Sequence, residues 1–246
     1  MLFIKSLFLV VFSLSFNATS QTIQFSSKDG LKVTADLYLT SNDDAPFIIL
    51  FHQAGWSRGE YLEIAPRLNE LGYNCMAVDQ RSGKTVNEVE NETAKRAAEK
   101  SLAQDYPDAL PDMYAAIAYV KENYKYKKLI LWGSSYSSAL VLKIAGDKPG
   151  IADATLSFAP GEYFTRYGKS DDWITQSAKN IKAPVFITSA KDEHAYWKGI
   201  FEVIPSENKQ SFLPETKGNH GSRALWKQFD DSVDYWKAVE AFLESL

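Results

Sequence analysis

The segment "LILWGSSYSSAL" (129–140) carries four serines between an apolar run and a helix-compatible stretch. A serine on a sharp turn from a strand into a helix is a nucleophile candidate, because the helix N-terminus and nearby backbone N–H groups favour the negative charge of an oxyanion. Such a turn needs small residues two positions before and two positions after the nucleophile. Ser135 has Gly133 and Ser137 at these positions, so we predict Ser135 as the nucleophile.

The other serines fit this role less well. Ser134 has the bulky Trp132 and Tyr136 at the same two positions, and Ser137 already lies inside the expected helix. Ser137 also replaces the second glycine of the usual Gly-x-Ser-x-Gly pattern, a change of one hydroxymethyl group that we expect the turn to tolerate. The alternative interpretation is a serine-rich helix cap without chemistry.

A hydroxyl nucleophile needs a base, and the chain has three histidines. His220 follows the expected last strand, "KQSFLPE", in the glycine-flanked loop "KGNHGSRAL", and we predict it as the base. His52 heads the loop "HQAGWSRG" after the strand "FIILF", where backbone N–H groups are expected to face an oxyanion. His194 lies close to another strand end and either contacts substrate or is simply exposed.

The base needs a carboxylate that fixes its tautomer and stabilises the imidazolium. Asp192 comes three residues after the strand "PVFITS" and is the predicted acid. Glu193 and Glu162 are the alternatives. The chain order Ser135, Asp192, His220 is the nucleophile, acid, base order of one particular architecture.

The expected elements would bring these residues together. Residues 21–38 predict a half-buried antiparallel hairpin that turns at 28–30, and five apolar runs predict buried parallel strands, at 47–51, 73–78, 128–132, 154–158 and 184–189. Amphipathic helices are expected between them, with a solvated helix in the charge-rich segment 84–112. Strands that alternate with helices predict a doubly wound α/β sheet, whose active site lies at the carboxyl ends of the strands.

With its motifs "FHQAGWSRGEY", "AVDQRSGK", "GSSYS", "SAKDE" and "NHG", residues 21–246 resemble the α/β-hydrolase family. The small size of the chain and the short segment between the expected strands at 154–158 and 184–189 are most similar to those of the cap-less, dienelactone-hydrolase-like and serine carboxylesterase members. The resemblance implies a mostly parallel sheet with helices on both faces. It also implies that the backbone N–H groups of Tyr136 and of Ala54, or of Gln53, bind the oxyanion.

The resemblance further implies a small carboxylic ester as substrate, without a cofactor or metal. We expect Gln53, Trp56, Tyr163 and His194 to contact it, since aromatic side chains are frequent in the segments around the expected cleft. A peptidase of the prolyl-oligopeptidase type and a catalytically silent binding protein of the same fold are the alternatives.

Composition limits the possible partners and the location. The chain has 246 residues, 45% apolar and 24% charged, with a formal net charge of −4, which gives no electrostatic signature of nucleic-acid binding. Residues 1–20, with Lys5 before a short apolar run, predict a signal peptide cut before Gln21 and hence an exported protein, periplasmic or secreted, without a membrane span. Cys75 is the only cysteine, so no internal disulfide can form.

Overall fold

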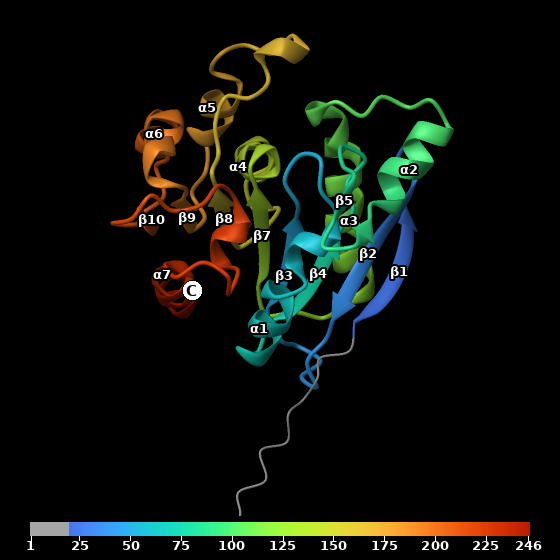
Figure 1. The fold of residues 1–246 in the computed structure, drawn as a ribbon, viewed down its shortest axis with the longest axis horizontal. Helices are drawn as coiled ribbons and strands as arrows, with labels where there is room; N and C mark the ends of the chain where they lie inside the picture. Colours follow the sequence, from blue (N-terminus) through green and yellow to red (C-terminus); the bar gives the residue numbers. More distant parts are fainter. Residues whose placement is uncertain (1–19) are drawn as a thin grey trace, which may run out of the picture.

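The computed structural model describes residues 20–246, so the predicted signal peptide lies, apart from Ser20, outside the described residues. Eight strands form one sheet in the order β1-β2-β4-β3-β7-β8-β9-β10, which runs from right to left in Figure 1. Their bounds are Gln21–Ser26 (β1), Lys32–Tyr38 (β2), Phe47–Phe51 (β3), Asn74–Val78 (β4), Leu129–Ser134 (β7), Ala154–Phe158 (β8), Val185–Thr188 (β9) and Lys209–Phe212 (β10).

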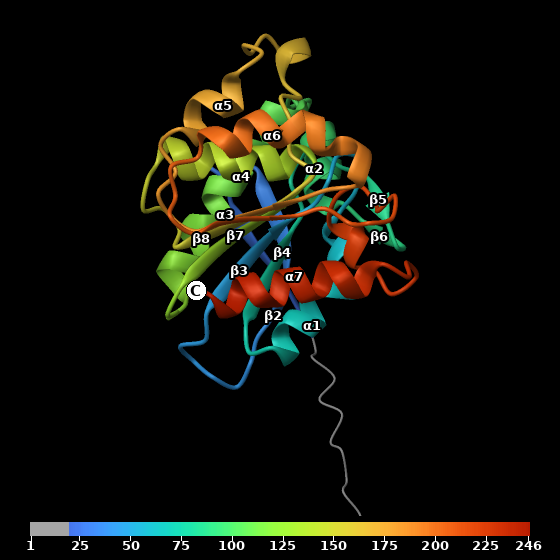
Figure 2. The ribbon, with the colours of Figure 1, turned by 90° about the vertical axis from the view of Figure 1, so that its left-hand side faces the viewer.

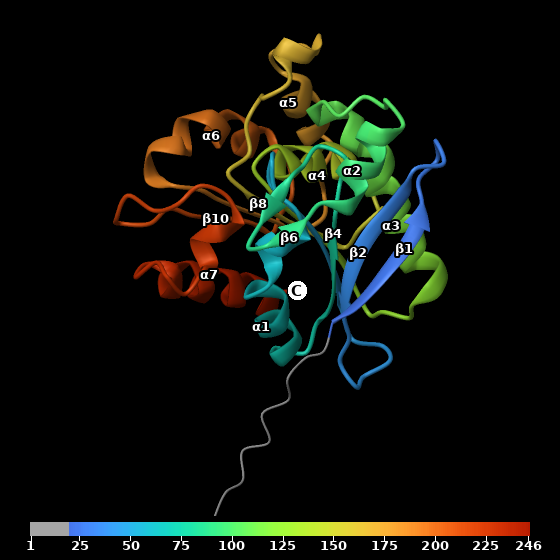
Figure 3. The same cartoon turned by 45° about the vertical axis from the view of Figure 1, so that its right-hand side comes forward.

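The sheet is mostly parallel, as the unbroken apolar runs predict. From β4 to β10 each strand pairs in parallel with its neighbour, whereas β2 pairs antiparallel with both β1 and β4. The expectation of a half-buried hairpin holds only for β1, which lies at the edge (Figure 3). β2 is buried on both faces because a helix lies against it, with Thr93 Oγ1 accepting a hydrogen bond from the backbone N–H of Thr34 at 2.9 Å.

Helices cover both faces of the sheet. Figure 2 shows α1 and α7 along one face and α3, α4 and α6 along the other, and each set encloses its own apolar core. The α-helices are Ile64–Glu70 (α1), Glu92–Glu99 (α2), Leu110–Asn123 (α3), Tyr136–Asp147 (α4), Trp173–Ala178 (α5), His194–Val203 (α6) and Ser232–Glu244 (α7). The 3-10 helices are Arg58–Tyr61 (η1), Tyr106–Ala109 (η2), Thr165–Tyr167 (η3), Lys191–Glu193 (η4) and Ser222–Leu225 (η5).

The charge-rich segment is only partly the solvated helix that its composition predicts. It begins with a small hairpin, β5 (Thr85–Val86) and β6 (Val89–Glu90), and continues into α2. Asn91 caps α2 by accepting a hydrogen bond from the N–H of Ala94 at 2.7 Å, and Asn91 itself is buried. The charged composition of the segment did not predict that the N-terminus of α2 is buried, because this depends on one residue, Asn91.

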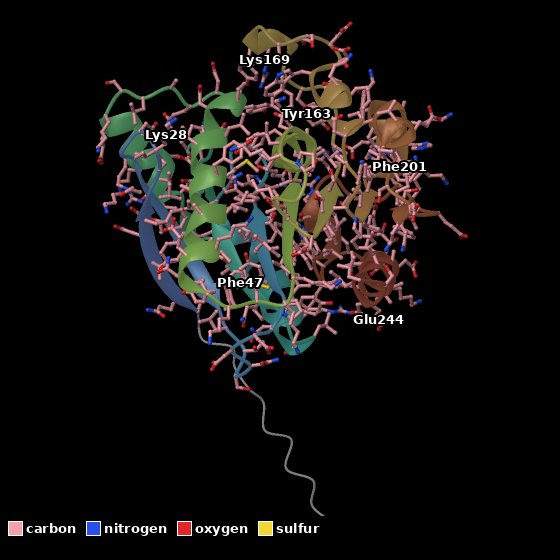
Figure 4. The ribbon with its side chains drawn as sticks, turned by 180° about the vertical axis from the view of Figure 1, so that it is seen from behind. Lys28, Phe47, Tyr163, Lys169, Phe201 and Glu244 are labelled. Carbon is pink, nitrogen blue, oxygen red and sulfur yellow. The ribbon has the colours of Figure 1, made fainter. Side chains whose placement is uncertain are left out.

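The chemistry-bearing loops all follow the carboxyl ends of parallel strands. They begin at His52 after β3, at Ser135 after β7, at Ser189 after β9 and at Leu213 after β10. Between β8 and β9 only η3 and the short α5 intervene, so no large cap covers this edge. In Figure 1 that segment projects above the sheet, and Figure 4 shows Lys169 on the projection and Tyr163 closer to the strands. Within residues 20–246, no helix is long and apolar enough to cross a membrane.

Candidate active site

Ser135 lies on a strained turn between β7 and α4. Its backbone has φ 57° and ψ −123°, a conformation that a non-glycine residue rarely adopts. The turn brings the backbone of α4 so close to β7 that a Cβ at position 133 would lie 2.4 Å from the carbonyl oxygen of Ser137. Gly133 is therefore required by packing, as the motif predicts, and the turn presents the Ser135 side chain at the end of the strand.

His220 contacts both neighbours that a catalytic base needs. Its Nε2 lies 2.8 Å from Ser135 Oγ, and its Nδ1 lies 2.5 Å from Glu193 Oε1. A carboxylate at Nδ1 places the imidazole proton there, so Nε2 is free to accept the serine proton. The structure thus brings together the predicted nucleophile and the predicted base.

The third partner differs from the predicted one. Asp192 is exposed and forms no hydrogen bond or ion pair with His220, whereas Glu193 is half-buried and its carboxylate lies against His220 Nδ1. Both residues belong to η4, and successive residues of a 3-10 helix point about 120° apart, so only one of them faces His220. Glu193 Oε2 also accepts a hydrogen bond from the N–H of Ala190 at 3.1 Å, which fixes the carboxylate.

Glu162, the other alternative for the acid, forms hydrogen bonds at the start of α5 instead. Its carboxylate accepts hydrogen bonds from the N–H groups of Ile174 and Thr175, at 2.9 and 2.8 Å, and from the Thr175 hydroxyl at 2.8 Å. A carboxylate at these positions stabilises the start of α5. Glu162 therefore holds the projecting segment and does not contact His220.

The hydrogen bonds of the loop after β3 exclude Gln53 as an oxyanion donor and leave Ala54 and Tyr136 as the candidates. The N–H of Gln53 donates to Glu60 Oε2 at 2.8 Å and is not free for a substrate. The next N–H along the loop is that of Ala54. Tyr136 is the first residue of α4, where backbone N–H groups have no partner within the helix. These two N–H groups fit the predicted pair, with Ala54 rather than Gln53 as the second donor.

Ser137 makes contacts that a glycine could not make. Its hydroxyl donates to the carbonyl oxygen of His52 at 2.6 Å and accepts from Gln80 Nε2 at 2.5 Å. The N–H of Gln80 in turn donates to His52 Nε2 at 3.0 Å, and His52 Nδ1 lies 2.8 Å from the carbonyl oxygen of Gln53. His52 is completely buried, and burial lowers the pKa of its imidazole to about 4. This neutral network ties the nucleophile turn to the oxyanion loop.

Four side chains were expected to contact substrate. The side chain of Gln53 is buried, and its Nε2 lies 3.5 Å from Glu60 Oε1. Trp56 stacks on Trp226 with ring centroids 5.3 Å apart, and Tyr163 donates from its hydroxyl to the carbonyl oxygen of Ala159 at 2.8 Å. His194 packs edge-on against Trp197 at 4.7 Å. Trp56, Tyr163 and His194 are only partly buried, whereas Gln53 serves the loop itself.

Glu60 was missed by sequence reasoning, although it contacts two of the loops at the site. It lies at the end of the motif "FHQAGWSRGEY", from which the resemblance assigns a role only to residues near the start of the loop. Cys75 is buried in β4, where burial raises the pKa of its thiol. A protonated, inaccessible thiol takes no part in nucleophilic chemistry.

Comparison with known families agrees with this geometry. A family model described as "Serine aminopeptidase, S33" matches residues 43–166, half of the chain, and the chain belongs to this family of α/β hydrolases. The matched region includes the oxyanion loop and the nucleophile turn but ends before Glu193 and His220. No curated protein matches the sequence significantly.

Solved structures show the same fold at low sequence identity. An esterase from Pyrococcus furiosus superposes with a TM-score of 0.67 at 18% identity, with 92% of each chain covered. A dienelactone hydrolase from Anabaena variabilis gives 0.68 at 14%, covering 91% of this chain and 95% of that one. An acylaminoacyl peptidase from Pyrococcus horikoshii gives 0.65 at 16%, covering 92% of this chain but 41% of the peptidase.

Proposed function

We propose that the protein is an exported serine hydrolase that cleaves a carboxylic ester through an acyl-enzyme on Ser135. The observation that carries this proposal is a pair of hydrogen bonds that connects Ser135 Oγ to His220 Nε2 at 2.8 Å and His220 Nδ1 to Glu193 at 2.5 Å. The strained backbone at Ser135 adds support, because such conformations persist mainly where function requires them.

In the first half of the reaction, His220 Nε2 takes the proton of Ser135 as Oγ attacks the ester carbonyl. The N–H groups of Tyr136 and Ala54 bind the oxyanion of the tetrahedral intermediate. The imidazolium then protonates the leaving alcohol, and its charge is stabilised by Glu193. In the second half, water replaces the alcohol, His220 activates it, and the acid is released from Ser135.

The substrate contacts in this proposal are Trp56, Tyr163 and His194. All three are partly exposed: Trp56 and Tyr163 lie in the segments after β3 and β8, and His194 is the first residue of α6. At these positions their rings can contact an acyl or alcohol group. The absence of a large cap favours a small, soluble ester over a long-chain lipid, since nothing in the described chain forms an apolar lid.

Peptide hydrolysis is the second candidate, because the matching family is described as a serine aminopeptidase and one structural neighbour is an acylaminoacyl peptidase. The same catalytic groups attack an amide, but amine leaving groups need more assistance than alcohols. A panel of p-nitrophenyl esters of increasing acyl length, measured beside aminoacyl p-nitroanilides, separates the two. Higher kcat/KM for the anilides would overturn the ester assignment.

The reaction itself is tested by labelling with a fluorophosphonate. We expect one adduct on Ser135, and Ser135→Ala to lower ester hydrolysis by about four orders of magnitude or more. Ser170→Ala, in an exposed loop, is the matched control and should keep full activity. Absence of an adduct in folded protein would favour the silent binding protein instead.

Export is proposed from the pattern of residues 1–20 alone. N-terminal sequencing of protein recovered from an exporting host should begin at Gln21. Recovery of the intact chain from the cytoplasm would contradict this part of the proposal without affecting the chemistry.

A further inference from the structure

A buried carboxylate lies behind the candidate active site. Glu60, in η1, is 0% exposed, and its two oxygens accept hydrogen bonds from different loops. Oε2 accepts from the N–H of Gln53 at 2.8 Å, and Oε1 accepts from the hydroxyl of Ser134 at 2.7 Å. Gln53 precedes the candidate oxyanion donor Ala54, and Ser134 precedes the candidate nucleophile. One carboxylate therefore holds the residues directly before two groups of the site.

The same contact network reaches the loop of the base. Ser134 Oγ accepts a hydrogen bond from the N–H of Ser222, two residues after His220, at 2.8 Å. Gly221 makes this approach possible, because a Cβ there would lie 2.5 Å from Ser134 Oγ. Since Ser134 Oγ accepts from Ser222, its own proton points to Glu60, and this arrangement suits an ionised carboxylate.

We propose that Glu60 is a positioning residue of the hydrolytic reaction, which turns the N–H of Ala54 toward the oxyanion and keeps the His220 loop in register with Ser135. The inference rests on the proposed function. It differs from a general stabilising role because the groups that Glu60 holds are each next to a group that acts in the transition state.

The electrostatic surroundings make this role dependent on pH. Burial raises the pKa of Glu60 to about 7, and the titratable groups near it are His220, Arg223, Tyr61 and Tyr136. Protonation of Glu60 would put a donor where Ser134 now donates, so one of the two hydrogen bonds must rearrange. The hydrogen bonds of Glu60 therefore change near pH 7.

The experiment compares Glu60→Ala and Glu60→Gln with Glu63→Gln, a change to an exposed carboxylate three residues away. For a p-nitrophenyl ester we expect Glu60→Ala to lower kcat by about 10²-fold to 10³-fold, the effect of losing an oxyanion donor, with KM changed less than about threefold. Glu60→Gln keeps an acceptor for Gln53 and should recover at least about tenfold of that loss. Glu63→Gln should match wild type.

The pH profile supplies a readout that a purely structural residue would not change. In wild type the acid limb of log kcat/KM should include the titration of Glu60, whose pKa burial raises to about 7, and Glu60→Gln should lack that contribution. If Glu60→Ala does not fold, Ser134→Ala replaces it, with an expected loss of about tenfold in kcat. Unchanged kcat in a folded variant, with only the melting temperature lowered, would overturn the inference.

Failure of this inference can be distinguished from failure of the proposed function. If wild type neither reacts with a fluorophosphonate at Ser135 nor cleaves an ester, the proposed function is wrong, and so is the positioning role of Glu60. If wild type does both and the Glu60 variants match it, only the positioning role is wrong.

Discussion

Two adjacent carboxylates offer a sharp test of the site, because only Glu193 contacts His220. In Glu193→Gln, one amide oxygen would face two donors, the N–H of Ala190 and the Nδ1–H of His220, which now bind separate oxygens at 3.1 and 2.5 Å. If the amide oxygen stays with Ala190, the amide N–H₂ faces Nδ1 and forces the imidazole proton onto Nε2. A protonated Nε2 cannot accept the proton of Ser135.

The expected cost follows from this wrong tautomer. A corresponding change of carboxylate to amide in a serine protease lowers kcat by about 10⁴-fold, or roughly 5 kcal/mol of transition-state stabilisation. We expect a loss of similar size in Glu193→Gln, with KM nearly unchanged. Asp192→Asn is the matched control and should keep kcat within about twofold, since Asp192 is exposed and does not contact His220.

The assay is hydrolysis of a p-nitrophenyl ester, with the concentration of folded active protein fixed by circular dichroism and by active-site titration. Both variants should keep the far-UV spectrum and melting temperature of wild type to within a few degrees, because neither side chain is part of the apolar core. A loss of activity in Asp192→Asn with full activity in Glu193→Gln would refute the assignment. That result would instead support Asp192, the acid predicted from its position in the chain.

Three further predictions concern the turn and the buried polar groups. Ser137→Ala removes hydrogen bonds to His52 and Gln80 and should cost about 2 kcal/mol, a fall of roughly 4–8 °C in melting temperature, with Ser170→Ala unchanged. Gly133→Ala should give little soluble protein, because its Cβ would lie 2.4 Å from a backbone oxygen. Burial raises the pKa of Glu60 from 4.5 to about 7, so the folded state binds its proton more tightly and loses stability as pH rises between these values. Urea unfolding at pH 5 and 8 should show a stability loss that is smaller in Glu60→Gln, by at most about 3 kcal/mol; an equal loss in both proteins would contradict the raised pKa.

The sheet and its parallel strands were predictable because they depend on runs of apolar residues. The predicted run at 47–51 coincides with β3 and the run at 154–158 with β8, since a strand buried on both faces contains little else. The nucleophile turn was predictable because it needs a residue without a Cβ at position 133, and the sequence has a glycine there. The hairpin β5–β6 was not predicted, since its strands are only two residues long and carry no alternating pattern.

The choice between Asp192 and Glu193 was beyond sequence reasoning. Counting residues from the end of β9 assumes an extended loop, whereas after Ser189 and Ala190 the chain enters η4, in which successive side chains point about 120° apart. The position of Glu193 depends on hydrogen bonds that long-range contacts create, including one from the N–H of Lys191 to the carbonyl oxygen of Lys217 at 2.9 Å. This bond joins the acid loop to the base loop and cannot be read from either segment alone.

Buried hydrogen bonds connect the loops of the site to one another. Ser137 joins the nucleophile turn to the oxyanion loop. Glu60 also joins these two, through Gln53 and Ser134, and Ser134 in turn bonds to the loop of His220. An apolar contact tolerates small sliding movements, whereas a buried hydrogen bond loses much of its energy when its angle or length changes. A nucleophile, a base and two N–H donors must agree in position to a fraction of an ångström. Buried hydrogen bonds therefore fix these groups more precisely than apolar contacts would, and they require a buried carboxylate, Glu60, whose pKa burial raises to about 7.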